Sequence, residues 1–443
     1  MSASPSSLDA GSSRSGDAVL DDLAWRGLVA QTTDGAALRR DLAAGPLTLY
    51  CGFDPTADSL HVGSLVPLLA LRRFQLAGHR PLALAGGATG FIGDPTGRSA
   101  ERVMMTPDVV AERVTRIGRQ MERFLDVDGP AGALVVDNLE WTASMSAIEF
   151  LRDVGRHFSI NQMLAKESVS ARLEAGGLTF TEFSYQLLQA HDYLELHRRY
   201  DCRLQIGGND QWGNITAGLD LIRRVEGGDR SVHALTLPLV TDASGGKIGK
   251  STGGGDVWLD PSMTSPYALY QYLLNVDDRD VATYLRLLTF LSREQVEELD
   301  AATAERPHAR AAQRALAEQL TALVHGPDEL QRVQAASAAL FGSGALEELD
   351  EPTLSAALAE APSTTVTGEA PPFVELLAAG LRLSKSEARR AVREGGAFLN
   401  NRKVADETAV PDETDWLHGR FLVLRRGRRT VAVVERVPGG RAG

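Results

Sequence analysis

The feature that most constrains this sequence is a stretch near its N-terminus that reads as a strand, an interrupted loop and a helix. Apolar and polar residues alternate over 47–51, which is the period of a half-buried strand. Glycine, proline and aspartate then break the strand, and a helical apolar pattern follows over 62–77. A helix start offers free N–H groups and a positive dipole end, which favour phosphate. His61, Thr56 and Gly63 lie there, although an ordinary strand-to-helix turn with a surface histidine explains these residues equally well.

Strands and helices continue to alternate through the first half of the chain. A short helix and a turn are expected over 18–45, strands at 81–85, 133–136 and 203–206, and helices at 107–127 and 180–196. This alternation predicts an α/β fold with a doubly wound parallel sheet, in which ligands bind beyond the carboxyl ends of the strands.

The domain organisation is predicted from shifts in pattern and composition. We expect a flexible tail at 1–17, a Rossmann-like catalytic domain at 18–262, an α-helical domain at 263–348, a linker at 349–372 rich in Ala, Pro, Thr and Glu, and a small α+β domain at 373–443. The tail has no apolar core and is not a secretory signal. No apolar run reaches membrane length.

Two segments that follow predicted strands carry polar residues between glycines. The first runs from Gly86 to Arg98 and reads as a glycine-rich loop with Thr89 and Asp94 set between apolar residues. The second, 207–214, reads as a glycine pair followed by an acid and a helix. Its carboxylate at Asp210 suits a ribose diol, and a simple helix N-cap explains it equally well.

The helix expected over 180–196 has an unusual second face. Tyr185, Gln189 and Asp192 are spaced at i, i+4 and i+7, so they lie along one side of the helix. Such a stripe is more often the wet side of a helix, but this helix is otherwise rich in large apolar residues. A phenol, an amide and a carboxylate on one wall suit an amino-acid ligand.

Lysine is rare in this chain, and two lysines stand close together. Of 46 basic residues only five are lysine, among them Lys247 and Lys250 in a loop flanked by glycines. A mobile loop with compact ammonium groups suits phosphate oxygens. A P-loop is excluded, because its first glycine would fall on Ser244 and because the glycines at 253–255 disfavour the helix that a P-loop opens.

The C-terminal region is basic although the chain is acidic overall. The net charge is −12, yet 14 Lys and Arg against 8 Asp and Glu occur from Leu381 onward, a local +6. A basic module on an acidic body predicts a polyanionic partner at that end, although a solvated surface is the simpler alternative. The candidate RNA-binding residues are Lys385, Arg389, Arg390, Arg393, Arg402 and Lys403.

The motifs resemble one known family when they are taken together. The loop from Phe53 to Ser64 resembles the first signature of class I aminoacyl-tRNA synthetases, and the loop at 247–251 resembles their second signature. The whole run from about residue 23 to 437 resembles tyrosyl-tRNA synthetases, and 373–404 resembles the S-four RNA-binding domain. One departure is Ser64, which stands where the commonest form of the signature has a second histidine.

The resemblance implies a role for each motif residue. The tyrosine contacts that it implies are Tyr50, Thr89, Asp94, Tyr185, Gln189, Asp192 and Gln211. The ATP contacts that it implies are Cys51, Gly52, Asp54, Gly63, Ser64, Gly208, Asp210 and Lys250. The residues that it implies in catalysis are Thr56, His61, Arg98, Arg102, Lys247, Lys250 and Ser251.

The activity implied by the resemblance is the ATP-dependent ligation of L-tyrosine to tRNA(Tyr). ATP would bring Mg²⁺ as part of the substrate, with no metal held by protein ligands alone and no tightly bound cofactor. The resemblance also implies a homodimer, and two cysteines without a disulfide framework fit a reducing cytoplasm. The alternatives are a tryptophanyl-tRNA synthetase, an RNA-binding relative without catalysis, and a small-molecule nucleotidyltransferase of the same fold.

Overall fold

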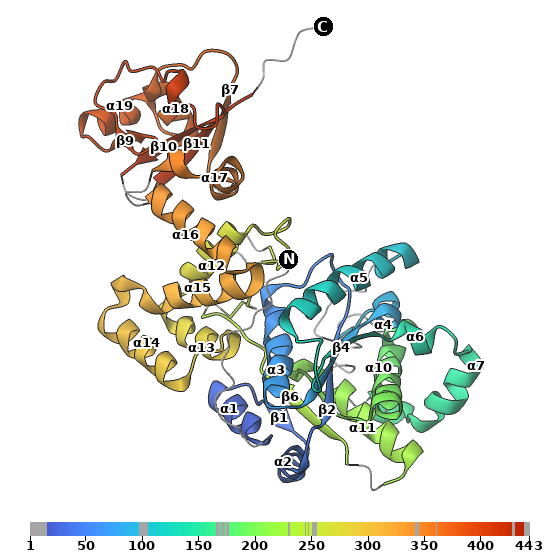
Figure 1. The fold of residues 1–443 in the computed structure, drawn as a ribbon. Helices are drawn as coiled ribbons and strands as arrows, with labels where there is room; N and C mark the ends of the chain where they lie inside the picture. Colours follow the sequence, from blue (N-terminus) through green and yellow to red (C-terminus); the bar gives the residue numbers. More distant parts are fainter. Residues whose placement is uncertain are drawn as a thin grey trace. The chain divides into compact units, whose positions relative to one another are not determined.

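The structure of the chain is a computed structural model. It describes residues 16–96, 105–164, 169, 173, 177–228, 231–243, 245–246, 248–249, 255–341, 345–359, 361–427 and 430–437. The chain divides into two compact units, and each is described by itself (Figure 1). The first unit runs to Asp260 and includes Asp277–Glu305, and the second comprises Pro261–Val276 and the chain from Arg306 onward.

The first unit is built on a six-stranded sheet in the order β1-β6-β5-β2-β3-β4. All neighbouring strands in it are parallel except β1 and β6, which are antiparallel. The strands are β1 (Gln31–Thr32), β2 (Thr48–Phe53), β3 (Arg80–Ala85), β4 (Leu134–Asp137), β5 (Cys202–Gly208) and β6 (His233–Leu237). In register, Tyr50 of β2 lies between Leu82 of β3 and Gln205 of β5.

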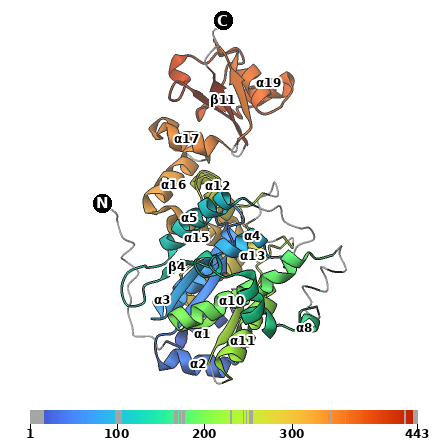
Figure 2. The same ribbon diagram turned by 90° about the vertical axis from the view of Figure 1, so that its right-hand side faces the viewer.

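Helices cover the sheet as the alternation predicts. From β2 the chain moves outward to β3 and β4, and it then returns past β2 to β5 and β6. Right-handed crossovers in these two directions place their helices on opposite faces. The helices α3 (Leu65–Leu76) and α5 (Pro107–Phe124) pack on β2, β3 and β4, and α10 (Phe180–Tyr200) and α11 (Trp212–Glu226) pack on β5 and β6 (Figures 1 and 2). The predicted doubly wound α/β fold is confirmed.

The remaining helices of the first unit lie outside this framework. They are α1 (Ala18–Arg26), α2 (Gly35–Ala44), α4 (Gly87–Ile92), α6 (Leu139–Thr142), α7 (Ala147–Glu149), α8 (Ile160–Leu164), α13 (Asp278–Leu288) and α14 (Arg293–Glu305). The helix expected from residue 62 begins with a 3₁₀ turn, Val62–Ser64, before α3. None of the described helices is long and apolar enough to cross a membrane.

Residues 87–92 form the short helix α4 where a glycine-rich loop was predicted. The glycines of this segment serve close packing. A Cβ on Gly87 would lie 2.2 Å from Oδ1 of Asp137, and a Cβ on Gly90 would lie 2.8 Å from Cγ of Pro55. The helix is fixed at its start by Asn138, whose side-chain oxygen accepts the N–H of Ala88 at 2.6 Å.

The second unit joins a group of helices to a five-stranded sheet. The helices are α12 (Pro266–Leu274), α15 (Ala311–His325), α16 (Pro327–Phe341), α17 (Glu351–Leu358), α18 (Phe373–Gly380) and α19 (Lys385–Arg393). The sheet has the order β7-β11-β10-β8-β9, with β7 (Ser363–Val366), β8 (Ala397–Leu399), β9 (Arg402–Lys403), β10 (Phe421–Arg426) and β11 (Thr430–Arg436). A core that includes Phe373, Leu422 and Leu424 forms beneath this sheet.

Two of the predicted domain boundaries differ from the structure. The segment 349–372, expected as a linker, contains α17 and the edge strand β7, which pairs in parallel with β11. Its Ala-rich part is a helix and its β-branched Thr-Val run is a strand, so the prolines mark element boundaries. The helices α13 and α14, expected in a separate helical domain, belong to the first unit.

The attachment of α13 to the first unit has a physical cause in two arginines. Arg26 donates to the carbonyl oxygens of Arg286, Thr289 and Leu291 at 3.0, 3.1 and 2.9 Å. Arg73 donates to that of Thr289 at 2.6 Å. Sequence patterns within one segment carry no signal of such long-range contacts.

Candidate active site

A cavity of about 270 Å³ opens at the carboxyl ends of β2 and β5, where the order of the parallel strands reverses. It is lined by the end of β2, the loop that follows it, α10, and the end of β5. Its lining residues are Tyr50, Cys51, Gly52, Phe53, Asp54, Thr56, Ser59, Leu60, His61, Ser64, Pro67, Leu84, Thr89, Asp94, Tyr185, Gln189, Asp192, Gln205, Ile206, Gly207, Gly208, Gln211 and Ile215.

Most of the predicted site residues lie in this one cavity, although they are dispersed along the sequence. The predicted stripe on α10 is there, together with the first signature loop and the two polar segments after β3 and β5. Gly63 and Asp210 are described but do not line the cavity. The predicted residues Arg98, Arg102, Lys247, Lys250 and Ser251 lie outside the described residues.

Asp54 connects two walls of the cavity. Its Oδ1 accepts a hydrogen bond from the Thr89 hydroxyl at 2.7 Å, and its Oδ2 accepts one from the Tyr185 hydroxyl at 2.8 Å. Burial and the neighbouring Asp54 carboxylate raise the pKa of Tyr185 well above its usual value, so this phenol stays protonated and donates. Asp54 thereby ties the first signature loop to α4 and α10.

Asp192 is a buried carboxylate held by two donors from the segment after β4. It is 2% exposed and accepts hydrogen bonds from Asn138 Nδ2 at 3.0 Å and from Trp141 Nε1 at 2.9 Å. Burial raises the pKa of Asp192 to about 7, although these two hydrogen bonds oppose the shift. The carboxyl group therefore changes charge near neutral pH.

Asn138 and Trp141 are residues that the sequence analysis did not select. Asn138 is fully buried, and besides Asp192 its side chain contacts the Thr89 hydroxyl at 3.1 Å and the start of α4. A polar residue directly after β4 was a signal that could have identified Asn138, because the carboxyl ends of parallel strands face the ligand. Trp141 had no such signal, since its pattern is that of an ordinary core residue.

Tyr50 projects a phenol toward the same end of the cavity. Its side chain is 1% exposed, and its ring packs edge-on to Tyr193 with the centroids 5.3 Å apart. Its hydroxyl has no hydrogen-bond partner among the described residues. Burial and the Asp192 charge raise the pKa of Tyr50 well above its usual value, so this hydroxyl remains a donor. The same wall holds Gln189, whose buried Oε1 also has no partner among the described residues.

Asp94 and Gln211 meet across the cavity from different loops. Gln211 Nε2 donates to Asp94 Oδ2 at 2.5 Å, and Thr96 N–H donates to Asp94 Oδ1 at 3.0 Å. These contacts bring the loop after α4 to the start of α11, so the predicted ammonium and carboxylate contacts of one amino acid lie side by side.

The first signature forms a tight turn against the segment that follows the lysine loop. The Ser64 hydroxyl accepts the backbone N–H of His61 at 3.4 Å, and Ser64 N–H donates to the His61 carbonyl at 2.8 Å. His61 forms an antiparallel bridge with Trp258, and Val62 N–H donates to Val257 O at 2.9 Å. The first signature therefore contacts the segment that follows the second signature in the sequence.

The loop of the first signature is supported from α5. Arg113 donates to Asp58 Oδ1 at 2.7 Å and to the Thr56 carbonyl at 3.1 Å. Ser59 and Leu60 are held in turn by the side chain of Gln120. These contacts fix the backbone on which Thr56 and His61 stand.

Glycine is required where the backbone of the site is most crowded. Gly249 has φ +86°, and a Cβ on it would lie 3.3 Å from the N atom of Gly63. A Cβ on Gly208 would lie 2.6 Å from Oδ1 of Asp210. A side chain at either position would therefore displace a neighbouring site residue. No cluster of His, Cys, Asp or Glu suited to a metal ion occurs among the described residues.

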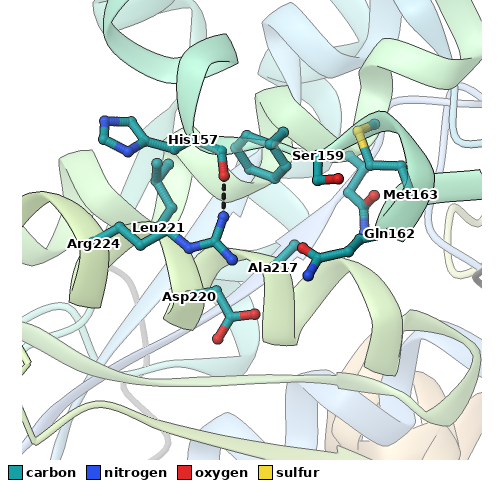
Figure 3. A pocket seen from close by; sticks show the side chains of 10 residues that line it. His157, Ser159, Gln162, Met163, Ala217, Asp220, Leu221 and Arg224 are labelled. Carbon is teal, nitrogen blue, oxygen red and sulfur yellow. Dashed lines mark hydrogen bonds between the residues drawn. The ribbon is translucent and has the colours of Figure 1, made fainter.

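A second, smaller cavity lies away from this site (Figure 3). It has a volume of about 50 Å³, which is room for a few water molecules. Arg224 donates to the carbonyl oxygen of His157 at its rim, and Gln162, Met163 and Asp220 lie around it.

The predicted RNA-binding residues of the C-terminal domain are exposed, and most have acidic partners. Their ion pairs are Lys385 with Glu375, Arg389 and Arg393 with Glu407, Arg390 with Glu394, and Arg402 with Asp415. The side chains of these basic residues are 57–67% exposed.

Comparison with known families agrees with this geometry. Residues 42–342 match the model of class I tRNA synthetases for tryptophan and tyrosine. Fold and cavity are thus those of a class I tRNA synthetase. Residues 353–434 match the C-terminal domain model of SYY-like tyrosine–tRNA ligases. The chain belongs to the tyrosine–tRNA ligase family of that class.

Individual relatives and solved structures support this assignment. The chain is 60% identical to the tyrosine–tRNA ligase of Nocardia farcinica over 95% of its length and 99% of the relative. It is 61% identical to that of Streptomyces coelicolor over 94% and 98%. The crystal structure of a C-terminally truncated mitochondrial tyrosyl-tRNA synthetase from Aspergillus nidulans has a TM-score of 0.66 at 29% identity, covering 73% of this chain and 94% of that one. A tryptophanyl-tRNA synthetase from Encephalitozoon cuniculi, with a TM-score of 0.53 at 13% identity over 73% and 94%, is similar in fold alone.

Proposed function

We propose that this chain activates L-tyrosine with ATP and transfers the tyrosyl group to tRNA(Tyr). The carboxylate of tyrosine attacks the α-phosphorus of ATP, which gives tyrosyl-adenylate and pyrophosphate. A terminal ribose hydroxyl of the tRNA then takes the tyrosyl group and releases AMP. The predicted tyrosine–tRNA ligase function is confirmed over the tryptophan alternative by relatives of about 60% identity along nearly the whole chain.

The proposed selectivity for tyrosine rests on one observation: Tyr50 and Asp192 are both buried and both line the cavity. The hydroxyl of a phenol substrate placed there can donate a hydrogen bond to the Asp192 carboxylate, which Asn138 and Trp141 hold in place. The same hydroxyl can accept a hydrogen bond from the Tyr50 hydroxyl, which has no partner among the described residues. At the other end of the substrate, Asp94, Tyr185 and Gln189 would hold the ammonium. Thr89 orients Asp54 beneath them, and Gln211 would approach the reacting carboxylate.

ATP is assigned to the side of the cavity formed by the first signature. Its phosphates would meet Thr56, His61 and the helix start at Ser64, and its ribose would meet Cys51 and Asp210. The backbone at Gly52, Gly63 and Gly208 leaves room for close approach. Asp54 is also assigned to the ATP side of the cavity. It positions the loop of the first signature, because its carboxylate oxygens accept hydrogen bonds from Thr89 and Tyr185.

Catalysis would come from placement and charge, because no residue of the site serves as a nucleophile. The negative charge that develops on the leaving pyrophosphate would be stabilised by the signature residues and by the basic side chains of the two loops. The residues assigned this role are Thr56, His61, Arg98, Arg102, Lys247, Lys250 and Ser251. Mg²⁺ would enter with ATP, bound largely by phosphate oxygens and water.

We place the contact with tRNA on the C-terminal domain, whose basic residues include Lys385, Arg393 and Lys403. Its basic residues would bind the phosphate backbone of a folded RNA. A cytoplasmic location fits the two cysteines, both of which are free and buried.

A homodimer is proposed from the apolar side chains exposed between α7 and the start of α10. Ile148, Leu151, Ile160 and Phe180 are exposed there, and Phe180 is 77% exposed. We assign these exposed apolar side chains to the surface that binds a second copy of the chain. Phe180→Asp should convert the dimer to a monomer in analytical ultracentrifugation, whereas the same change at exposed Leu76, which lies at the end of α3, should not.

The function is tested by tyrosine-dependent ATP–pyrophosphate exchange followed by aminoacylation of tRNA. Exchange should occur with tyrosine and not with tryptophan. A chain that binds tRNA but shows no exchange would be the catalytically inactive relative.

The role of Lys250 is tested separately. Lys250→Ala should slow adenylate formation strongly and leave the tyrosine Kd near that of the wild type, because the charge acts on the transition state. Loss of tyrosine affinity with an unchanged rate would remove Lys250 from this role.

A further inference from the structure

The segment that leads into the lysine loop is a compact turn between Val240 and Ile248. Ile248 N–H donates to Val240 O at 3.0 Å, and Asp242 N–H donates to Gly246 O at 2.7 Å. Gly245 N–H donates to Asp242 O at 2.9 Å, and Gly246 N–H donates to the Asp242 carboxylate at 2.9 Å. Because Lys247 lies between Gly246 and Ile248 in the sequence, this turn fixes both neighbours of the first lysine.

The tip of the turn is bound to a helix that is remote in the sequence. Ala243 N–H donates to Asp280 Oδ2 at 2.9 Å. Asp280 is a half-buried residue in the first turn of α13, 37 positions further along the chain. The helix begins with its own cap, in which Asp277 accepts the N–H of Arg279 at 2.9 Å. Asp280 is therefore available to a partner outside its helix.

The far end of α13 is anchored in the first unit by two buried cations. Arg26 and Arg73 are 6% and 4% exposed, and both donate to the Thr289 carbonyl that follows the helix. Their positive charges face the negative end of the α13 dipole, an arrangement that stabilises the helix. These contacts fix the position of α13 in the first unit, and with it the position of Asp280 in the first turn of the helix.

The other end of the turn contacts the first signature. Gly249 lies against Val62 and Gly63, and Gly249 O accepts Val257 N–H at 2.6 Å. The turn is therefore held at its tip by α13 and at its exit by the backbone of the ATP side.

We propose that Asp280 is a positioning residue for the reaction: through the Ala243 N–H it holds the turn that leads into the loop whose lysines are assigned to the phosphates of ATP. This role rests on the assignment of those lysines to pyrophosphate stabilisation. Asp280 touches neither substrate, so it affects the rate only through the turn.

The expected effect is on the activation step alone. Loss of one hydrogen bond to a charged acceptor leaves the turn free to occupy other positions, and the rate of adenylate formation should fall about tenfold in Asp280→Ala. The Kd of tyrosine should not change, because the contact is remote from Tyr50 and Asp192. Asp280→Asn keeps a side-chain oxygen that can accept the Ala243 N–H, so it should retain most of the rate.

The experiment is stopped-flow measurement of tyrosyl-adenylate formation in full-length protein, with the tyrosine Kd measured in parallel. The variants are Asp280→Ala, Asp280→Asn, Lys250→Ala and the double variant of Asp280→Ala with Lys250→Ala. The matched control is Glu298→Ala, which removes an exposed carboxylate from the neighbouring helix α14 and should keep the wild-type rate. If Asp280 acts through the lysines, the two losses should not be independent, and the double variant should be slowed by less than the product of the two single losses.

The possible results distinguish a failure of the positioning role of Asp280 from a failure of the role assigned to Lys250. A wild-type rate in Asp280→Ala, an equal loss in Asp280→Asn, or a double variant whose loss is the full product of the two single losses would each overturn the positioning role. A wild-type rate in Lys250→Ala would instead refute the assigned role of Lys250. A tenfold loss in Asp280→Ala that Asp280→Asn largely restores, with tyrosine affinity unchanged, supports the proposal.

Discussion

The selectivity for tyrosine over phenylalanine should depend on pH, because the carboxyl group assigned to the substrate hydroxyl titrates near neutrality. Burial raises the pKa of Asp192 to about 7 in the ligand-free protein. Above that pH the ionised carboxylate accepts a hydrogen bond from a phenol. Below it the neutral acid has lost its charge and one acceptor position. Selectivity should therefore be present above pH 7 and decline as the pH falls through 7.

The size of the effect follows from the ionised fraction of Asp192. With a pKa of about 7, this fraction is about nine-tenths at pH 8 and about one-tenth at pH 6. If only the ionised form recognises the phenol, kcat/KM for tyrosine relative to phenylalanine falls roughly tenfold between these values. Phenylalanine serves as the internal reference, because titrations of the shared ammonium and of ATP affect both substrates.

The assay is pyrophosphate exchange with each amino acid from pH 5.5 to 8.5, in the wild type and in Asp192→Asn. The wild-type ratio should follow one ionisation, and the ratio in Asp192→Asn should be low and independent of pH, because the amide does not titrate. A flat wild-type ratio across pH 7 would refute the reasoning, since the selective group would then not change charge. A slope that persists in Asp192→Asn would assign the titration to another residue.

Three further predictions concern the same site and the C-terminal domain. Tyr50→Phe should erode the tyrosine-to-phenylalanine ratio of kcat/KM roughly tenfold, the worth of about one hydrogen bond, and an unchanged ratio would remove Tyr50 from the pocket. Trp141→Phe deletes a hydrogen bond to the ionised form of Asp192, so the midpoint of the pH profile should move to higher pH, and an unmoved midpoint would contradict that contact. Deletion of 361–443 removes the whole C-terminal sheet, including β7, and should leave pyrophosphate exchange largely intact while tRNA charging is lost. Normal charging would refute RNA binding there.

The sequence predicted which residues would share one cavity where their placement depends on strand ends and helical spacing. Tyr50, Asp94, Asp192 and Gln211 are far apart in the chain, yet each lies within β2, after the end of a strand, or on a helix that lines the cavity. A doubly wound sheet brings these positions to one crevice. The i, i+4, i+7 stripe on α10 is likewise a geometric consequence of the helix, and burial of Tyr185 and Asp192 shows that it is not a wet face.

The features that were missed depend on partners remote in the sequence. The strand β7 forms because it pairs with the edge of β11, and the local sequence around β7 does not predict that pairing. The helix α4 forms from a glycine-rich run because Asn138 caps it and Asp137 lies too close for any side chain at Gly87. Trp141 contributes to the site through its indole N–H, which donates to Asp192. A sequence pattern shows only that a large apolar residue stands at this position and does not predict that hydrogen bond.

Most of the predicted RNA-binding residues of the C-terminal domain already form ion pairs with acidic side chains of the same domain. Each pair satisfies both charges locally, but it leaves the net +6 of the region unchanged. Exposed pairs of this kind contribute only about 0–1 kcal/mol each, so exchanging a carboxylate such as Glu407 for an RNA phosphate costs little. Arg389 and Arg393, one helical turn apart on α19, share the same partner, Glu407. Binding would then be driven by released counterions and by the net positive charge, with a steep dependence on salt concentration.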